Sequence, residues 1–327
     1  MIFLDPFDPK IVNAKNEHFD KLFPIIKTRV ESLPAGELKS FLNDLRIRNI
    51  LSDLPDKLEN HHKDWLNNIT GISLAEWEDY LTSKKKQSRY RSPVENALVV
   101  KYDPILSQIK TLFKYEGGFE RKSSSYSTYD LAKNLNVNTC LYCNRIYTKT
   151  VLNPYKITRP EFDHWYPKST YPLLALSFYN LIPSCHICNS SVKSTTLMTT
   201  SEFLHPYIPE NIDYKFSYWI ESVNKYNFHI KRPFPSKEHN TIRAFKIEEI
   251  YETHRDEIND LVRLRKLYSI DYLLKLKSLL KSVDSNVSIE EIYRLAFGTH
   301  YNESNFSKRP LSKMKRDILE ELGMILK

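Results

Sequence analysis

The chain has only four cysteines, and they form two pairs of identical spacing. Cys140-Leu-Tyr-Cys143 and Cys185-His-Ile-Cys188 both follow the pattern C-x2-C. Two such knuckles supply four thiolates, which is the full ligand set of a tetrahedral Zn2+ ion. Because four protein ligands leave no open coordination position, we expect this zinc to be structural. The alternatives are four unbound thiols or two disulfides.

Residues between and beside the knuckles have the side chains that could hold a second cation and activate a water. Asp163 offers carboxylate oxygens and Asn189 a carbonyl oxygen, which suit Mg2+ or Mn2+ better than zinc. An unperturbed imidazole titrates near neutral pH, so we expect His164 to be the general base. Phosphodiester hydrolysis needs a base for the attacking water and a cation that faces the developing charge. The simpler interpretation makes Asp163 and His164 surface strand residues and the asparagines turn residues.

The order and spacing of these residues resemble the HNH endonucleases, in the zinc-bearing branch with a ββα-metal core. The similar pattern is C-x2-C, then Phe162-Asp163-His164-x-x-Pro167, then Asn180-Leu181, then C-x2-C-Asn189-x3-Lys193. It covers about residues 138 to 195. The resemblance implies that His164, Asn180 and Asn189 are the three signature residues. It also implies that Asn180 fixes the loop and orients His164 instead of binding metal.

One segment departs from the common family pattern. After the Asp-His-x-x-Pro turn, where the family often has glycine-rich sequence, this chain has Lys168-Ser-Thr-Tyr-Pro172. In this respect it is similar to HNH nucleases of bacterial anti-phage defence systems, such as the Septu nuclease subunit. That similarity implies a defence role with a separate ATPase partner, since the chain has no P-loop motif of its own.

Three basic residues in or next to the motif are candidates for phosphate binding. Lys168 and Lys193 lie inside it, and Lys193 falls one helical turn after Asn189, so both could face one groove. Arg145 follows the first knuckle. The alternative for each is an ordinary solvated side chain. The net charge of +8 favours a polyanionic partner without proving one.

The elements that must position these residues indicate an α+β protein that is mostly helical. We expect an N-terminal helical region over 1–130, a zinc-stapled nuclease domain over 131–200, a small strand-rich connector over 201–243 and a C-terminal helical region over 244–327. The strands of the connector should pair as a small antiparallel sheet.

Local signals predict some element boundaries. Ser92-Pro93-Val94-Glu95 is typical of a capped helix start, and Asp103-Pro104 of a break in that helix. Residues 145–148 and 156–159 could pair as a hairpin, with 161–163 extending its second strand. A short helix should begin near His186.

Taken together, these features predict a metal-dependent endonuclease that acts on DNA. The alternatives are a non-catalytic zinc-stabilised module that binds nucleic acid, or an RNA-cleaving toxin on the same core. No apolar run reaches the roughly 20 residues that span a bilayer, so we expect no membrane partner. The absence of a secretory signal at the N-terminus and the metal-type cysteine pairs favour a reducing, cytoplasmic location.

Overall fold

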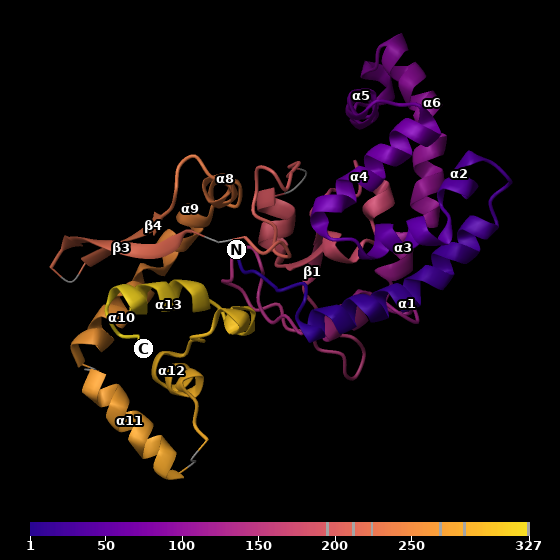
Figure 1. Cartoon of the computed structure of the whole chain (residues 1–327). Helices are drawn as coiled ribbons and strands as arrows, with labels where there is room; N and C mark the ends of the chain where they lie inside the picture. The colour runs from indigo at the N-terminus through magenta and orange to yellow at the C-terminus, as the bar shows by residue number, and fades with distance from the viewer. Residues whose placement is uncertain (194–195, 211–212, 224, 268–269, 284–285, 326–327) are drawn as a thin grey trace.

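This computed structural model describes residues 1–193, 196–210, 213–223, 225–267, 270–283 and 286–325. Seven α-helices make up most of its N-terminal part. They form one end of the molecule (Figure 1). Their bounds are α1 Pro9–Glu31, α2 Glu37–Phe41, α3 Asp44–Ser52, α4 Pro55–Trp65, α5 Leu74–Lys85, α6 Pro93–Leu112 and α7 Thr128–Leu135.

Helix α6 begins as the sequence predicts, because Ser92 and Glu95 form a capping box with proline at the first helical position. The predicted break at Asp103-Pro104 is wrong. The helix continues through Pro104 to Leu112. Pro104 costs one main-chain hydrogen bond, and the buried face of the same helix, with Tyr102 and Leu106, offsets that loss.

The middle of the chain holds a two-stranded antiparallel sheet followed by a short helix. Strand β1, Glu161–His164, pairs with β2, Leu181–Ser184, so that His164 lies opposite Leu181. The helix η6, Ile187–Lys193, contacts β1. The predicted hairpin between 145–148 and 156–159 is wrong. Isolated bridges join Thr139 to Tyr147 and Val151 to Thr158 instead.

A second small sheet and a set of helices form the opposite end of the molecule (Figure 1). The predicted antiparallel pair is confirmed as β3, Lys215–Ser222, and β4, Lys225–Lys231. Helix α13 packs on β3, and α10 packs on β4 and α13. The helices are α8 Lys237–Ala244, α9 Ile247–Tyr251, α10 Arg255–Leu267, α11 Ile270–Val283, α12 Ile289–Phe297 and α13 Ser312–Glu321.

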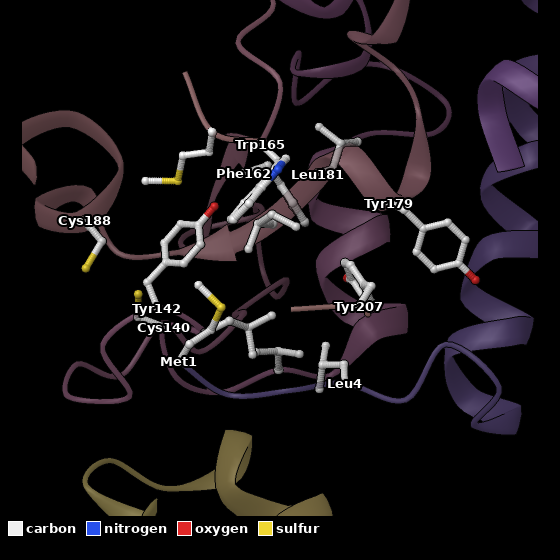
Figure 2. Close-up of a cluster of buried hydrophobic side chains, with 14 of the residues drawn as sticks. Met1, Leu4, Cys140, Tyr142, Phe162, Trp165, Tyr179, Leu181, Cys188 and Tyr207 are labelled. Carbon is white, nitrogen blue, oxygen red and sulfur yellow. The ribbon is translucent and has the colours of Figure 1, made fainter. Parts of the chain in front are cut away.

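The first residues of the chain run through the middle of the molecule and join its parts. The main-chain N–H of Ile2 donates to the carbonyl of Leu141 at 2.7 Å, and that of Leu4 donates to Pro206 at 2.8 Å. Met1 and Leu4 lie in the same apolar cluster as Tyr142 and Trp165 (Figure 2). Each large side chain buried there stabilises the fold by about 2 kcal/mol or more relative to exposure.

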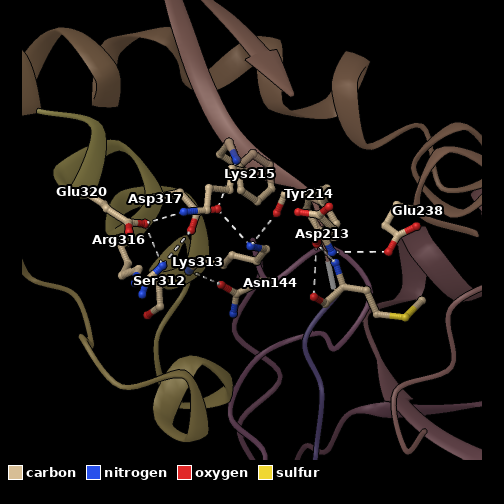
Figure 3. Close-up of polar contacts among 12 residues, drawn as sticks. Asn144, Asp213, Tyr214, Lys215, Glu238, Ser312, Lys313, Arg316, Asp317 and Glu320 are labelled. Carbon is tan, nitrogen blue, oxygen red and sulfur yellow. Dashed lines mark hydrogen bonds and ion pairs between the residues drawn. The ribbon is translucent and has the colours of Figure 1, made fainter. Parts of the chain in front are cut away.

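Polar contacts fasten the C-terminal helices to this centre (Figure 3). Asp317 of α13 accepts a hydrogen bond from the main chain of Phe216 at 3.1 Å and pairs with Lys313 at 2.9 Å. Lys313 also donates to the carbonyl of Tyr214 at 3.0 Å. One buried core therefore runs from the N-terminal segment to α13. The predicted fold class, α+β and mostly helical, is confirmed.

None of the described helices combines the length and the apolar character that a membrane-spanning segment needs.

Candidate functional site

The four cysteines converge on one point. Their sulfur atoms all lie within 4.8 Å of one another, every cysteine is buried, and none is in a disulfide. The Sγ atoms of Cys143 and Cys185 are 4.0 Å apart. Zinc–sulfur bonds of about 2.3 Å in a tetrahedron place the sulfurs roughly 3.8 Å apart. The cluster can therefore hold one metal ion, and four soft thiolates favour zinc.

Main-chain hydrogen bonds close the turn at each knuckle. Asn144 follows the first pair with φ of 50°, a left-handed conformation that asparagine tolerates better than most residues. Its main-chain N–H donates to the carbonyl of Cys140 at 2.8 Å, and its side-chain amide donates to the carbonyl of Phe306 at 2.9 Å. In the second pair, the N–H of Asn189 donates to the carbonyl of Cys185 at 3.0 Å. The knuckles are thus fixed locally and tied to the C-terminal part.

Beside this cluster, the structure brings the predicted catalytic residues to one cleft. Asp163, His164 and Asn189 all line a cavity of about 440 Å3, together with Lys168. β1 supplies the first two, η6 begins two residues before Asn189, and the loop after β1 supplies Lys168. The two strands and the helix thus place a base, oxygen donors and a cation side chain around one space.

His164 is held in one orientation at the wall of this cleft. Its Nε2 lies 3.0 Å from the carbonyl oxygen of Ala175, and the ring of Tyr115 packs edge-on against it at 4.5 Å between centroids. Burial lowers the pKa of His164 to about 3, with Lys168 adding to the effect. The imidazole is therefore neutral at ordinary pH. Because a carbonyl only accepts, Nε2 carries the proton, and Nδ1 keeps the free electron pair that a general base needs.

Asn180 locks the loop that carries this acceptor. It is fully buried, and its Oδ1 accepts from the main chain of Tyr166 at 2.7 Å. Its Nδ2 donates to the carbonyls of Tyr166 at 3.1 Å and Leu174 at 2.9 Å. Asn180 therefore fixes both ends of the loop, from Tyr166 beside the strand to Leu174 next to Ala175.

The carboxylate of Asp163 already has two buried partners. Its carboxylate accepts a hydrogen bond from the Tyr142 hydroxyl at 2.5 Å and pairs with Lys193 Nζ at 3.0 Å. Lys193 also donates to the carbonyl of His164 at 2.8 Å, and its side chain is 0% exposed. This placement argues against the expected phosphate contact for Lys193. It serves as the buried counter-ion of Asp163.

Glu161 is the carboxylate that the sequence reasoning missed. It lines the same cleft, and its Oε2 accepts from Asn189 Nδ2 at 2.8 Å while its Oε1 lies 2.8 Å from His186 Nδ1. This contact uses the amide nitrogen of Asn189 and leaves the carbonyl oxygen as the atom that can face a cation. The signal was in the sequence, because residues i and i+2 of a strand share a face, and Glu161 stands two before Asp163.

Of the other two predicted phosphate-binding residues, only Lys168 lies in the cleft. Lys168 lines the cleft, where it pairs with Glu116 at 2.8 Å and lies over the Tyr115 ring at 4.9 Å. Arg145 lies outside the cleft, near His254, whose pKa is lowered by burial and then by the Arg145 charge. Arg159, which the sequence reasoning did not single out, lines the cleft instead.

No protein-family model, curated protein or solved structure matches this chain.

Proposed function

We propose that this chain is a metal-dependent endonuclease of the HNH type, which hydrolyses phosphodiester bonds. The observation that carries the proposal is His164, a neutral imidazole fixed by Ala175 beside the oxygen donors of Glu161 and Asn189. A purely structural knuckle would need none of these groups. The resemblance of the motif to HNH enzymes adds to this argument.

The residues of the cleft suit the three tasks of the reaction. His164 Nδ1 would accept the proton of the attacking water, and the contact of Nε2 with Ala175 would keep the ring aligned. The carboxylates of Glu161 and Asp163 and the carbonyl oxygen of Asn189 form an oxygen-rich set suited to Mg2+ or Mn2+. When bound, such an ion would stabilise charge on the phosphate and the leaving oxygen. Lys168 and Arg159 would bind the neighbouring phosphates.

The cysteine cluster is directly connected to two residues of the cleft, and we propose that it binds a structural zinc. Tyr142 lies between the two cysteines of the first knuckle and donates to Asp163. Asn189 follows directly after Cys188 of the second knuckle. A metal ion that fixes the four sulfurs would therefore also fix Tyr142, which donates to Asp163, and the position of the Asn189 side chain.

We propose DNA as the substrate. A cytoplasmic role in anti-phage defence, with a separate ATPase partner, is proposed on the resemblance alone. The test is to incubate the purified chain with plasmid, single-stranded DNA and RNA, each with Mg2+, Mn2+ or EDTA. Cleavage of DNA that EDTA abolishes supports the proposal. Cleavage of RNA alone would favour the toxin alternative. Tight binding without cleavage in any divalent ion would favour the non-catalytic module.

A further inference from the structure

A second cleft opens beside the catalytic one and shares part of its wall. It has a volume of about 380 Å3, and Tyr115, Lys168 and Ser169 line both cavities. The C-terminal end of α6 and the segment after it, from Lys110 to Glu116, form its other side. The second cleft is therefore a direct neighbour of the space at His164.

The two clefts differ in charge. The catalytic cleft has three carboxylates, Glu120, Glu161 and Asp163, against the two cations Arg159 and Lys168. The second cleft has three lysines against one glutamate, Glu116. Glu116 pairs with Lys168, and its pKa is lowered by Lys168 and, to a smaller extent, by the charge of Lys110. The ammonium groups of both lysines therefore face the same space. The second cleft is therefore suited to anions.

The two outer lysines of this cleft are available to a ligand. Lys110 and Lys114 are exposed, and neither has an ion-pair partner among the residues that the structure describes. The stem of Lys114 packs against Gly118, where an added Cβ would approach its Cγ to 3.2 Å. Glycine at 118 thus allows the Lys114 stem to lie against the turn, at the edge of the cleft.

The floor of the second cleft is apolar. Phe113, Tyr115, Pro172 and Ala175 line it, and all four are buried. An apolar floor with basic residues at the rim matches a nucleotide, whose base is flat and apolar on its faces and whose phosphates are anionic. The volume falls in the range of small-ligand sites, roughly 300–1,000 Å3.

From this juxtaposition, and given the proposed endonuclease function, we infer that the second cleft binds one unpaired nucleotide next to the phosphate that is cleaved. Lys110 and Lys114 contact its phosphates, and the base lies on the floor beside Tyr115. A base in a fully paired duplex cannot enter this space, so the preferred substrate is a single strand or an unpaired end.

The test measures binding in EDTA, which separates binding from cleavage. The dissociation constant of a fluorescent single-stranded oligonucleotide is followed by anisotropy across a salt series, for wild type and for the Lys110→Gln/Lys114→Gln variant. Each lost phosphate contact lowers the slope of log K against log salt by about 0.7, so the double variant should lose about 1.4. Affinity at low salt should fall by roughly tenfold.

The matched control is Lys275→Gln/Lys281→Gln on α11, which removes the same charge from two exposed lysines at the opposite end of the molecule. It should keep the wild-type slope. Equal slopes for both variants and wild type would overturn the subsite. So would wild-type affinity for a duplex of the same sequence that equals the affinity for the single strand.

The same samples distinguish the two proposals. Lysine-dependent binding without cleavage in any divalent ion would refute the endonuclease and leave the subsite standing. Cleavage with an unchanged salt slope would refute the subsite alone. A wild-type chain that neither binds nor cleaves would refute both.

Discussion

At the scale of single residues, the cleft gives its two ionisable neighbours on β1 different surroundings. His164 is buried against Tyr115 and a carbonyl, which lowers its pKa and keeps it neutral. Asp163 has a buried lysine and a hydroxyl as partners. A neutral base and a charge-compensated carboxylate can thus stand side by side on one short strand.

Glu161 should control metal affinity. Glu161→Gln removes a charged oxygen donor but keeps the size of the side chain, so we expect the Mg2+ concentration for half-maximal cleavage to rise by roughly tenfold or more. Rates measured across a Mg2+ titration check this. Glu120→Gln is the matched control, since Glu120 lines the same cleft but pairs with Arg159 at 3.8 Å, while Asn189 donates to Glu161. An unchanged Mg2+ dependence in Glu161→Gln would remove Glu161 from the ligand set.

Lys193 should matter for stability more than for substrate binding. Lys193→Met leaves the buried Asp163 carboxylate without its counter-ion, which costs about 3–5 kcal/mol. Urea unfolding monitored by circular dichroism gives the free energy of unfolding. The double variant Lys193→Met/Asp163→Asn, which has no buried charge at this pair, should recover much of that loss. A single variant as stable as wild type, with only a weaker affinity for nucleic acid, would restore Lys193 as a phosphate contact.

At the scale of elements, the knuckles and the β1–β2 sheet act together. Tyr142 connects the first knuckle to β1, and η6 carries both a cysteine of the second knuckle and Asn189. The cluster replaces part of the apolar core that so short a segment cannot build.

Loss of one thiolate should therefore affect both stability and catalysis. Cys185→Ser should lose its bound zinc and several kcal/mol of stability, because roughly 10–16 kcal/mol of zinc binding is coupled to folding in small zinc modules. Metal analysis and thermal unfolding check this. Ser190→Ala, at an exposed position of η6, should keep both zinc and stability. A zinc-free Cys185→Ser variant with wild-type stability would contradict the structural role of the cluster.

At the scale of the whole molecule, buried histidines make stability depend on pH. Burial lowers the pKa of His18 to about 4 and that of His62 to about 3. Below pH 6.5 the unfolded chain binds protons at these positions and the native chain does not. Stability therefore falls as pH falls from about 6.5 towards 3, by up to about 1.4 kcal/mol per pH unit for each such histidine.

His62→Leu isolates one of these contributions. The ring of His62 lies among Trp65, Trp77 and Tyr171, and neither ring nitrogen has a hydrogen-bond partner among the described residues. The variant should be at least as stable as wild type at pH 7 and lose about 1.4 kcal/mol per pH unit less below pH 6. Urea unfolding at a series of pH values measures both slopes. Parallel pH curves for the two proteins would contradict the assignment.

The sequence predicted correctly those features of the fold that depend on residues close together in the chain. The Ser92 cap and the β3–β4 pair are confirmed, because capping and strand alternation depend on near neighbours. The partner of β1 was missed, since β2 lies beyond a loop and the nearer hairpin looked sufficient. Lys193 was predicted to contact phosphate, since lysine is seldom buried, and only tertiary packing shows it buried against Asp163.

The most direct test of the central proposal is the cleavage rate of His164→Ala relative to wild type, with Mg2+ and identical purification. The proposal predicts a fall of roughly 100- to 10,000-fold with zinc content and unfolding temperature retained. His229→Ala, which removes a half-exposed imidazole from β4, should cut at the wild-type rate. A folded His164→Ala protein that cleaves DNA as fast as wild type would contradict the proposed general base and, with it, this assignment of the cleft.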